Sequence, residues 1–188
     1  VPIWQQGFIR GGRIYASFLA LYAVVEDARL RDEPLYIAFV DVRKAFPSVH
    51  RDILFQKLSE AGVPDVLVRA LWAAYDGSIG TVRGPDGTSR LFEFLTGTRE
   101  GGVESPLLFV MFVWDLIEQL EQVQLEGADV RLSGRPVRAL QLADDLALIA
   151  RRADGLNRLL GRWGQYCDRH HQETQLKKTF VTPFCTQT

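Results

Sequence analysis

The chain has 188 residues, a formal net charge of −1 and a hydrophobic content of 47%. This length suits one domain or two closely packed subdomains, and the composition excludes a disordered or fibrous chain. The longest apolar run, residues 106–116, is interrupted by Asp115 and is too short for a membrane span, so we expect no membrane role. The net charge gives no general support for nucleic-acid binding, although the C-terminal third is locally basic.

The chain begins at Val1 without an initiator Met or a signal peptide, which suggests a fragment of a longer protein. Its two cysteines are too few for a disulfide framework and favour an intracellular compartment, nucleus or cytoplasm. Cys167 and Cys185, with His170 and His171, offer a zinc site, but their spacing is poor for tetrahedral coordination. A buried cysteine beside a solvated histidine pair is the simpler interpretation.

In the first half of the chain, helical apolar spacing alternates with short strand-forming runs. The expected elements are a helix over 14–31, a strand over 35–41, helices over 49–61 and 65–75, and a hairpin with strands over 79–83 and 89–95. Pro34 ends the first helix, Ser48 is expected to cap the second, and Gly-Pro-Asp-Gly marks the hairpin turn.

In the second half, a glycine-rich segment over 96–102 precedes Ser105-Pro106, which predicts a helix cap and a first-turn proline. The expected elements are a helix from there to about 120, strands over 130–132 and 136–150 around two turns, a helix over 154–170, and a strand over 179–184. This irregular order predicts an α+β fold whose helices pack on one face of the sheet.

Two carboxylates, Asp144 and Asp145, stand at the centre of the apolar run 140–149, and Asp41 ends the apolar strand 35–40. A tight hairpin with the pair at its tip, beside the strand that ends in Asp41, would bring all three together. Clustered carboxylates repel unless cations neutralise them, and oxygen ligands select magnesium or manganese. The same pattern also fits a plain turn and a helix cap, and the spacing alone favours that simpler alternative.

Five segments in order resemble the reverse transcriptases of non-LTR retrotransposons. They are Gln6-Gly7-Phe8 with Arg13, the acid-to-aromatic segment Asp41 to Phe46, the glycine-rich segment Thr98 to Phe109, Leu142-Ala-Asp144-Asp145, and Gln175 to Thr179. The resemblance covers almost the whole chain. It implies a right-hand polymerase palm, an antiparallel sheet backed by helices, with part of the fingers and no thumb. Residues 1–34 would be a fingers portion and 35–188 mostly palm, with an inserted fingers portion around 62–96.

The resemblance also implies a function: an RNA-directed DNA polymerase that extends a DNA primer with dNTPs on an RNA template. Asp41, Asp144 and Asp145 would hold two Mg²⁺ or Mn²⁺ ions, with Asp145 as the weaker ligand. The sequence does not indicate an oligomeric state.

Nucleotide contacts are implied for five further residues, namely Val42, Phe46, Gly101, Lys178 and Arg13. The Phe46 ring would exclude a 2′-hydroxyl by steric clash, although core packing is its simpler role. Gly101 would let the backbone approach the nucleotide closely. Lys178 would lie near the triphosphate, with a solvated lysine as the alternative.

Two departures from the family pattern leave alternatives open. Glu100 replaces the usual Gln, where an acid would repel a triphosphate unless Arg99 or Arg43 pairs with it, and Leu142 replaces an aromatic residue. A catalytically weakened or domesticated palm that binds nucleic acid is therefore one alternative. A viral RNA-dependent RNA polymerase is another, and Phe46 argues against it because such an enzyme must admit the 2′-hydroxyl.

Overall fold

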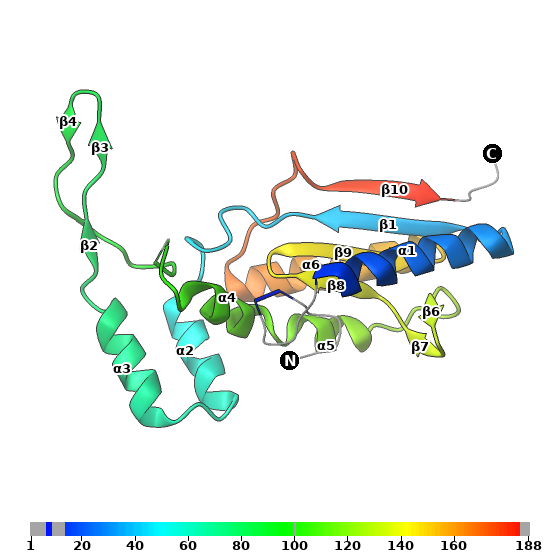
Figure 1. Ribbon diagram of the computed structural model, residues 1–188, viewed down its shortest axis with the longest axis horizontal. Helices are drawn as coiled ribbons and strands as arrows, with labels where there is room; N and C mark the ends of the chain where they lie inside the picture. The colour runs from blue at the N-terminus through cyan, green and yellow to red at the C-terminus, as the bar shows by residue number, and fades with distance from the viewer. Residues whose placement is uncertain (1–6, 9–13, 100, 185–188) are drawn as a thin grey trace.

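The centre of the molecule is a four-stranded antiparallel sheet in the order β10-β1-β9-β8 (Figure 1). The computed structural model describes residues 7–8, 14–99 and 101–184. The strands are β1 (Leu35–Val40), β8 (Ala139–Leu142), β9 (Asp145–Ala150) and β10 (Phe180–Phe184). Each neighbouring pair is antiparallel, which confirms the expected α+β class.

The strand β1 is buried on both faces, which explains its continuous apolar sequence. Leu35 and Ile37 belong to one hydrophobic cluster, whereas Ala38 and Val40 belong to another. Because side chains alternate along a strand, these two clusters lie on opposite faces of the sheet. The sheet is therefore the middle layer of the fold.

Helices cover both faces of the sheet, so the expectation of helices on one face is wrong. The larger cluster joins the sheet to α2 (Arg51–Glu60), α4 (Ser105–Val113), α5 (Leu116–Glu121) and α6 (Ala153–His170). On the opposite face, α1 (Ile14–Arg31) packs through Val24 and Ala28 on the second cluster (Figure 1). In the part of the chain that the structure describes, no helix has the length and apolar character to cross a membrane.

An extended hairpin follows α3 (Asp65–Tyr75) and projects away from the central sheet (Figure 1). Its strand pairs are β2 (Ile79–Gly80) with β5 (Phe92–Glu93) and β3 (Arg83–Gly84) with β4 (Gly87–Thr88). A shorter hairpin, β6 (Arg131–Leu132) with β7 (Arg135–Pro136), precedes β8. Both hairpins were predicted from their turn residues, Gly-Pro-Asp-Gly over 84–87 and Ser133-Gly134.

The single helix expected from 105 to about 120 is broken between α4 and α5. The carbonyl of Phe112 accepts a hydrogen bond from Lys57 Nζ at 2.5 Å, and Tyr166 OH lies 3.1 Å from the same oxygen. Lys57, only 6% exposed, also donates to Asp115 Oδ1 at 2.5 Å. In a continuous helix the Phe112 carbonyl would accept a hydrogen bond from a backbone N–H of the next turn. Here side chains occupy this carbonyl instead, which interrupts the helix.

The two expected serine caps are also wrong. His50 precedes the first turn of α2, and Ser48 Oγ instead donates to Ala45 O at 3.1 Å and to Gln172 Oε1 at 3.2 Å. Ser105 is the first residue of α4 rather than its cap, and its hydroxyl donates to Arg99 O at 2.6 Å. Both hydroxyls therefore fix loops beside the helices.

Candidate active site

The hairpin between β8 and β9 carries the two adjacent acids. Leu142 pairs with Asp145, so Ala143 and Asp144 form a two-residue turn. Ala143 has φ of +57°, as the first position of a type II′ turn requires. Asp144 therefore lies in the turn, and Asp145 is the first residue of β9.

Asp41 lies at the same edge of the sheet. The pairing of β1 with β9 joins Val40 to Leu146, which places the next residue, Asp41, beside Asp145. Burial raises the pKa of Asp145 above its ordinary value, and the negative charges of Asp144 and Asp41 raise it further. The three carboxylates therefore share one electrostatic environment.

The backbone of Asp41 is fixed by the segment that leads to β10. Its N–H donates to Thr179 Oγ1 at 3.3 Å, and its carbonyl accepts from the Gln175 N–H at 2.8 Å. Lys178 Nζ lies 3.7 Å from Asp41 Oδ2, but the lysine side chain is 69% exposed. Such an exposed pair is weak, so the lysine is available to another anion.

Two cavities meet at these acids, and Asp41 and Lys178 line both. We call the first, with a volume of about 560 Å³, the polar cleft. Its lining comprises Asp41, Val42, Lys44, Ala45, Phe46, Pro47, Arg99, Gly101, Gly102, Ser105, Pro106, Asp144, Gln175 and Lys178. The second, the apolar pocket of about 320 Å³, lies between α1 and the sheet and includes Asp145 and Phe18.

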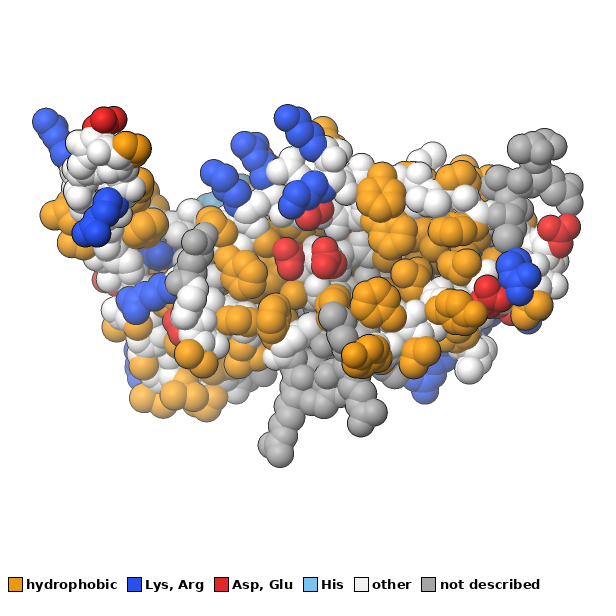
Figure 2. All heavy atoms as spheres, turned by 45° about the horizontal axis from the view of Figure 1, so that its top comes forward, with side chains coloured by type: hydrophobic (Ala, Val, Ile, Leu, Met, Phe, Trp, Pro, Cys, Tyr) orange, Lys and Arg blue, Asp and Glu red, His pale blue; other side chains and the backbone are white. Residues whose placement is uncertain are grey.

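The surface around the acids has a marked charge pattern. Figure 2 shows acidic side chains near the centre of this face, a group of Lys and Arg side chains just above them, and apolar side chains beside them. Three cations, Lys44, Arg99 and Lys178, line the polar cleft together with Asp41 and Asp144. The cleft therefore presents carboxylates to cations and cations to anions.

Four of the five residues expected to contact a nucleotide, Val42, Phe46, Gly101 and Lys178, line this cleft. Gly101 has φ of +79°, a conformation that favours glycine. Val42 lies between two backbone hydrogen bonds, Arg43 N–H to Glu173 O and Gln175 N–H to Asp41 O. Arg13 and Glu100 lie outside the described residues.

The loop over 96–99 is attached to the segment that follows Asp41. Gly97 N–H donates to Val49 O at 2.8 Å, and Thr98 N–H donates to Phe46 O at 3.0 Å. Gly97 has φ of +87°, and a Cβ there would meet Pro47 O at 2.8 Å. A glycine is required because the two segments approach so closely.

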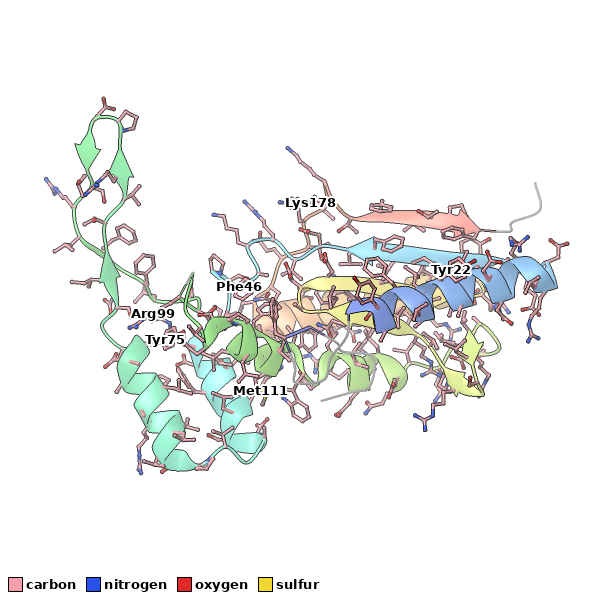
Figure 3. All side chains as sticks on the ribbon, viewed as in Figure 1. Tyr22, Phe46, Tyr75, Arg99, Met111 and Lys178 are labelled. Atoms are coloured by element: carbon pink, nitrogen blue, oxygen red, sulfur yellow. The ribbon has the colours of Figure 1, made fainter. Side chains whose placement is uncertain are left out.

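Tyr75 and Arg51 hold the same loop from α3 and α2, and neither role could be predicted from the sequence. The Tyr75 hydroxyl donates to Glu104 Oε1 at 3.0 Å and accepts from the Arg99 N–H at 3.4 Å. Arg51 donates to Gly97 O at 3.0 Å and to Tyr75 O at 2.8 Å. The Arg99 guanidinium lies 5.3 Å from the centre of the Tyr75 ring, and Figure 3 shows these two side chains side by side.

The two arginines considered as partners for Glu100 have other contacts. Arg43 Nη1 lies 2.7 Å from Glu173 Oε2, with both side chains exposed. Arg99 Nη2 donates to Ala74 O while its guanidinium lies on Tyr75.

The chemistry of the three carboxylates fits a hard divalent cation, because every donor is an oxygen. Burial, and then the negative charges of Asp144 and Asp41, raise the pKa of Asp145, and a bound cation would offset both effects. Within residues 7–8, 14–99 and 101–184, no three acidic, His or Cys side chains are already close enough to hold a metal. The zinc alternative gains no support there either, and Cys167 is a free, buried cysteine whose pKa burial raises to about 12. Cys185 lies outside the described part.

The antiparallel sheet, the helices packed on it and the acids at one edge define the palm of a right-hand polymerase. The profile of the reverse transcriptase (RNA-dependent DNA polymerase) family matches residues 2–184, and the chain belongs to that family.

Similar sequences come from R2 retrotransposable elements, which confirms the non-LTR type. The chain is 28% identical over 158 residues to the retrovirus-related Pol polyprotein of a type-1 R2 element from Nasonia vitripennis, covering 84% of this chain and 15% of that protein. It is 30% identical over 146 residues to the corresponding protein of Bradysia coprophila, covering 77% of this chain and 16% of that protein. The chain thus spans 15–16% of the length of these two relatives.

Solved telomerase structures share the fold. Apo telomerase from Candida tropicalis, truncated of its C-terminal domain, matches with a TM-score of 0.70 and 12% identity, over 94% of this chain and 36% of that one. Candida albicans telomerase in complex with a fragment of telomeric RNA gives a TM-score of 0.67 and 13% identity, over 94% of this chain and 32% of that one. At this identity the likeness establishes the fold alone.

Proposed function

We propose that the chain is the polymerising core of an enzyme that copies an RNA template into DNA by adding dNTPs to the 3′-hydroxyl of a DNA primer. The observation that carries this proposal is the edge of the sheet where Asp41 and Asp144 line the polar cleft and Asp145 lies beside them. The cleft combines acids for cations with cations for phosphates, which is the pairing that phosphoryl transfer requires.

Asp41 and Asp144, with Asp145 beside them, would hold Mg²⁺ or Mn²⁺ ions. Such ions, when bound, supply positive charge that activates the primer hydroxyl and stabilises the leaving pyrophosphate. The chain's own cations have a separate task. Lys44, Arg99 and Lys178 line the cleft and neutralise the triphosphate.

Phe46 lines the same cleft as Lys178 and Arg99, and all three are labelled in Figure 3. We assign it the exclusion of the 2′-hydroxyl, and we assign Gly101 and the Val42 backbone to close contact with the nucleotide. Residues 1–34 and about 62–96 are proposed as fingers and the remainder as palm. An intracellular setting belongs to the same proposal.

Primer extension tests the proposal directly. The protein expressed from its complete reading frame should extend a DNA primer on an RNA template with dNTPs and much less with rNTPs, in Mg²⁺ or Mn²⁺. Asp41→Asn and Asp144→Asn should each lower the rate about 100-fold or more, since metal charge supplies several kcal/mol. Asp65→Asn is the matched control, because Asp65 is an exposed residue of α3 paired with Arg69.

A second readout does not depend on activity. Mg²⁺ at ten times its dissociation constant should stabilise the wild-type protein by about 1.4 kcal/mol, seen as a higher melting temperature. Asp41→Asn should lose most of this gain, and Asp65→Asn should keep it. Binding of template and primer without any extension by the wild-type protein would refute polymerase activity and favour a nucleic-acid-binding scaffold instead.

A further inference from the structure

The Phe46 ring is held between the polar cleft and the hydrophobic core. Phe46 is half-buried and lines the cleft. Its ring also contacts Phe109 of α4, with ring centroids 5.0 Å apart and planes tilted by 34°. Phe109 is fully buried and is not among the residues that line the cleft. Phe109 therefore contacts the ring from the core rather than from the cleft.

The backbone of Phe46 is anchored independently of its ring. Its carbonyl accepts hydrogen bonds from Thr98 N–H at 3.0 Å and from Val49 N–H at 3.4 Å. These bonds fix the main chain but leave the side chain free to rotate about its own bonds. What limits the ring is the packing behind it, and the principal aromatic contact there is Phe109.

A residue that excludes a hydroxyl by steric clash works only if it cannot move away. A ring displaced by a fraction of an ångström relieves most of a clash, because repulsion falls steeply with distance. A void behind the ring would permit this movement, whereas close packing prevents it.

We infer that Phe109 is a positioning residue for sugar selection, which holds the Phe46 ring against the cleft so that a 2′-hydroxyl is excluded. This inference rests on the proposed function. Because Phe109 does not line the cleft, its effect on the nucleotide passes through Phe46.

The same helix supplies a matched control. Phe112 is also fully buried and lies three residues further along α4. Its ring contacts His170 edge-on at 5.7 Å and lies under Lys57, rather than beside Phe46. Phe109→Leu and Phe112→Leu remove the same atoms from the same core, so both lower stability, but only the first leaves space behind Phe46.

The test measures kcat/KM for matched dNTP and rNTP incorporation in the protein from the complete reading frame. We expect Phe109→Leu to raise rNTP relative to dNTP use about 3- to 10-fold, the range given by the loss of an aromatic contact. Phe112→Leu should change the ratio less than about twofold. Melting temperatures should fall similarly in both variants. If Phe109→Leu does not fold, Phe109→Met, which retains more volume, is judged by the same ratio.

The outcomes separate the inference from the function. An equal change of ratio in the Phe109 and Phe112 variants would overturn the inference, because general loosening of α4 would explain it. The inference would also be overturned if Phe46→Val raised the ratio of rNTP to dNTP use while Phe109→Leu left this ratio unchanged. That result would still leave Phe46 as the residue that selects the sugar. No extension by the wild-type protein would overturn the proposed function, and the inference with it.

Discussion

The Tyr75 hydroxyl links α3 to the loop that forms one side of the polar cleft, and its removal tests how the cleft is held. Tyr75→Phe keeps the ring, which lies beside the guanidinium groups of Arg51 and Arg99. It removes the 3.0 Å hydrogen bond to Glu104 Oε1 and the 3.4 Å bond from the Arg99 N–H. Tyr75 is 2% exposed, so water cannot easily replace the hydroxyl.

The size of the effect follows from these contacts. A hydrogen bond to a charged acceptor contributes about 1.5–3 kcal/mol, and the longer bond to Arg99 adds little. The loop should therefore open about 10- to 100-fold more often. Because Arg99 and Ser105 line the polar cleft, nucleotide binding requires the closed loop, so KM for dNTP should rise in proportion as the closed form is depopulated, reaching about tenfold when the open loop becomes the main form.

The assay combines local and functional measurements. Hydrogen exchange of the peptide over 101–108 should accelerate in Tyr75→Phe, and steady-state primer extension should show the higher KM. Tyr166→Phe is the matched control, because Tyr166 is a buried tyrosine whose hydroxyl lies 2.9 Å from Asp115 Oδ1, outside the residues that line the cleft. A similar rise of KM in both variants, or unchanged exchange at 101–108 in Tyr75→Phe, would refute the reasoning.

Two other substitutions test buried and clustered charges. Lys57→Met should lower the free energy of unfolding by about 3 kcal/mol in chemical denaturation, because it leaves Asp115 and the Phe112 carbonyl without their buried cation. A loss below about 1 kcal/mol would contradict this. The pKa of Asp145 is higher in the folded protein than its ordinary value of about 3.9. Ionisation of Asp145 therefore lowers the free energy of unfolding as the pH rises from the ordinary pKa through the folded pKa. Asp145→Asn should therefore become more stable than wild type as pH rises to 7 without divalent ions. The margin should be small, because the burial that raises the pKa is partial and much of the side chain stays accessible to water. An equal difference at pH 3.5 and pH 7 would exclude this cause.

The sequence predicted the elements because their signals are local. The helices over 14–31 and 65–75 have the bounds that apolar spacing indicated, and the strand ending at Asp41 proved to be the buried centre of the sheet. The pairing that brings β1 beside β9 is not local. The pairing of these two strands was expected only because each of the two apolar runs carries acidic residues. The resemblance to reverse transcriptases supported the same expectation.

Other features depended on contacts between distant segments. The break between α4 and α5 comes from Lys57 and Tyr166, which lie 55 and 54 residues from Phe112 in sequence. One signal was present for Lys57, which falls beside Leu54 and Leu58 on the buried face of a predicted helix. The partners of Tyr75 had no such signal, since a tyrosine at a helix end has many possible neighbours.

The adjacent acids Asp144 and Asp145 occupy different surroundings, and this difference bears on their roles. Asp144 lies in the turn and lines the polar cleft with Asp41, whereas Asp145 begins β9 and lines the apolar pocket with the same Asp41. A cation in the polar cleft would therefore meet Asp41 and Asp144 directly. Asp145, whose pKa is raised by burial and by both neighbours, would act mainly by adding negative charge beside them. Two neighbouring carboxylates of the same type would thus have separate tasks in the proposed site, because the turn ends and a strand begins between them.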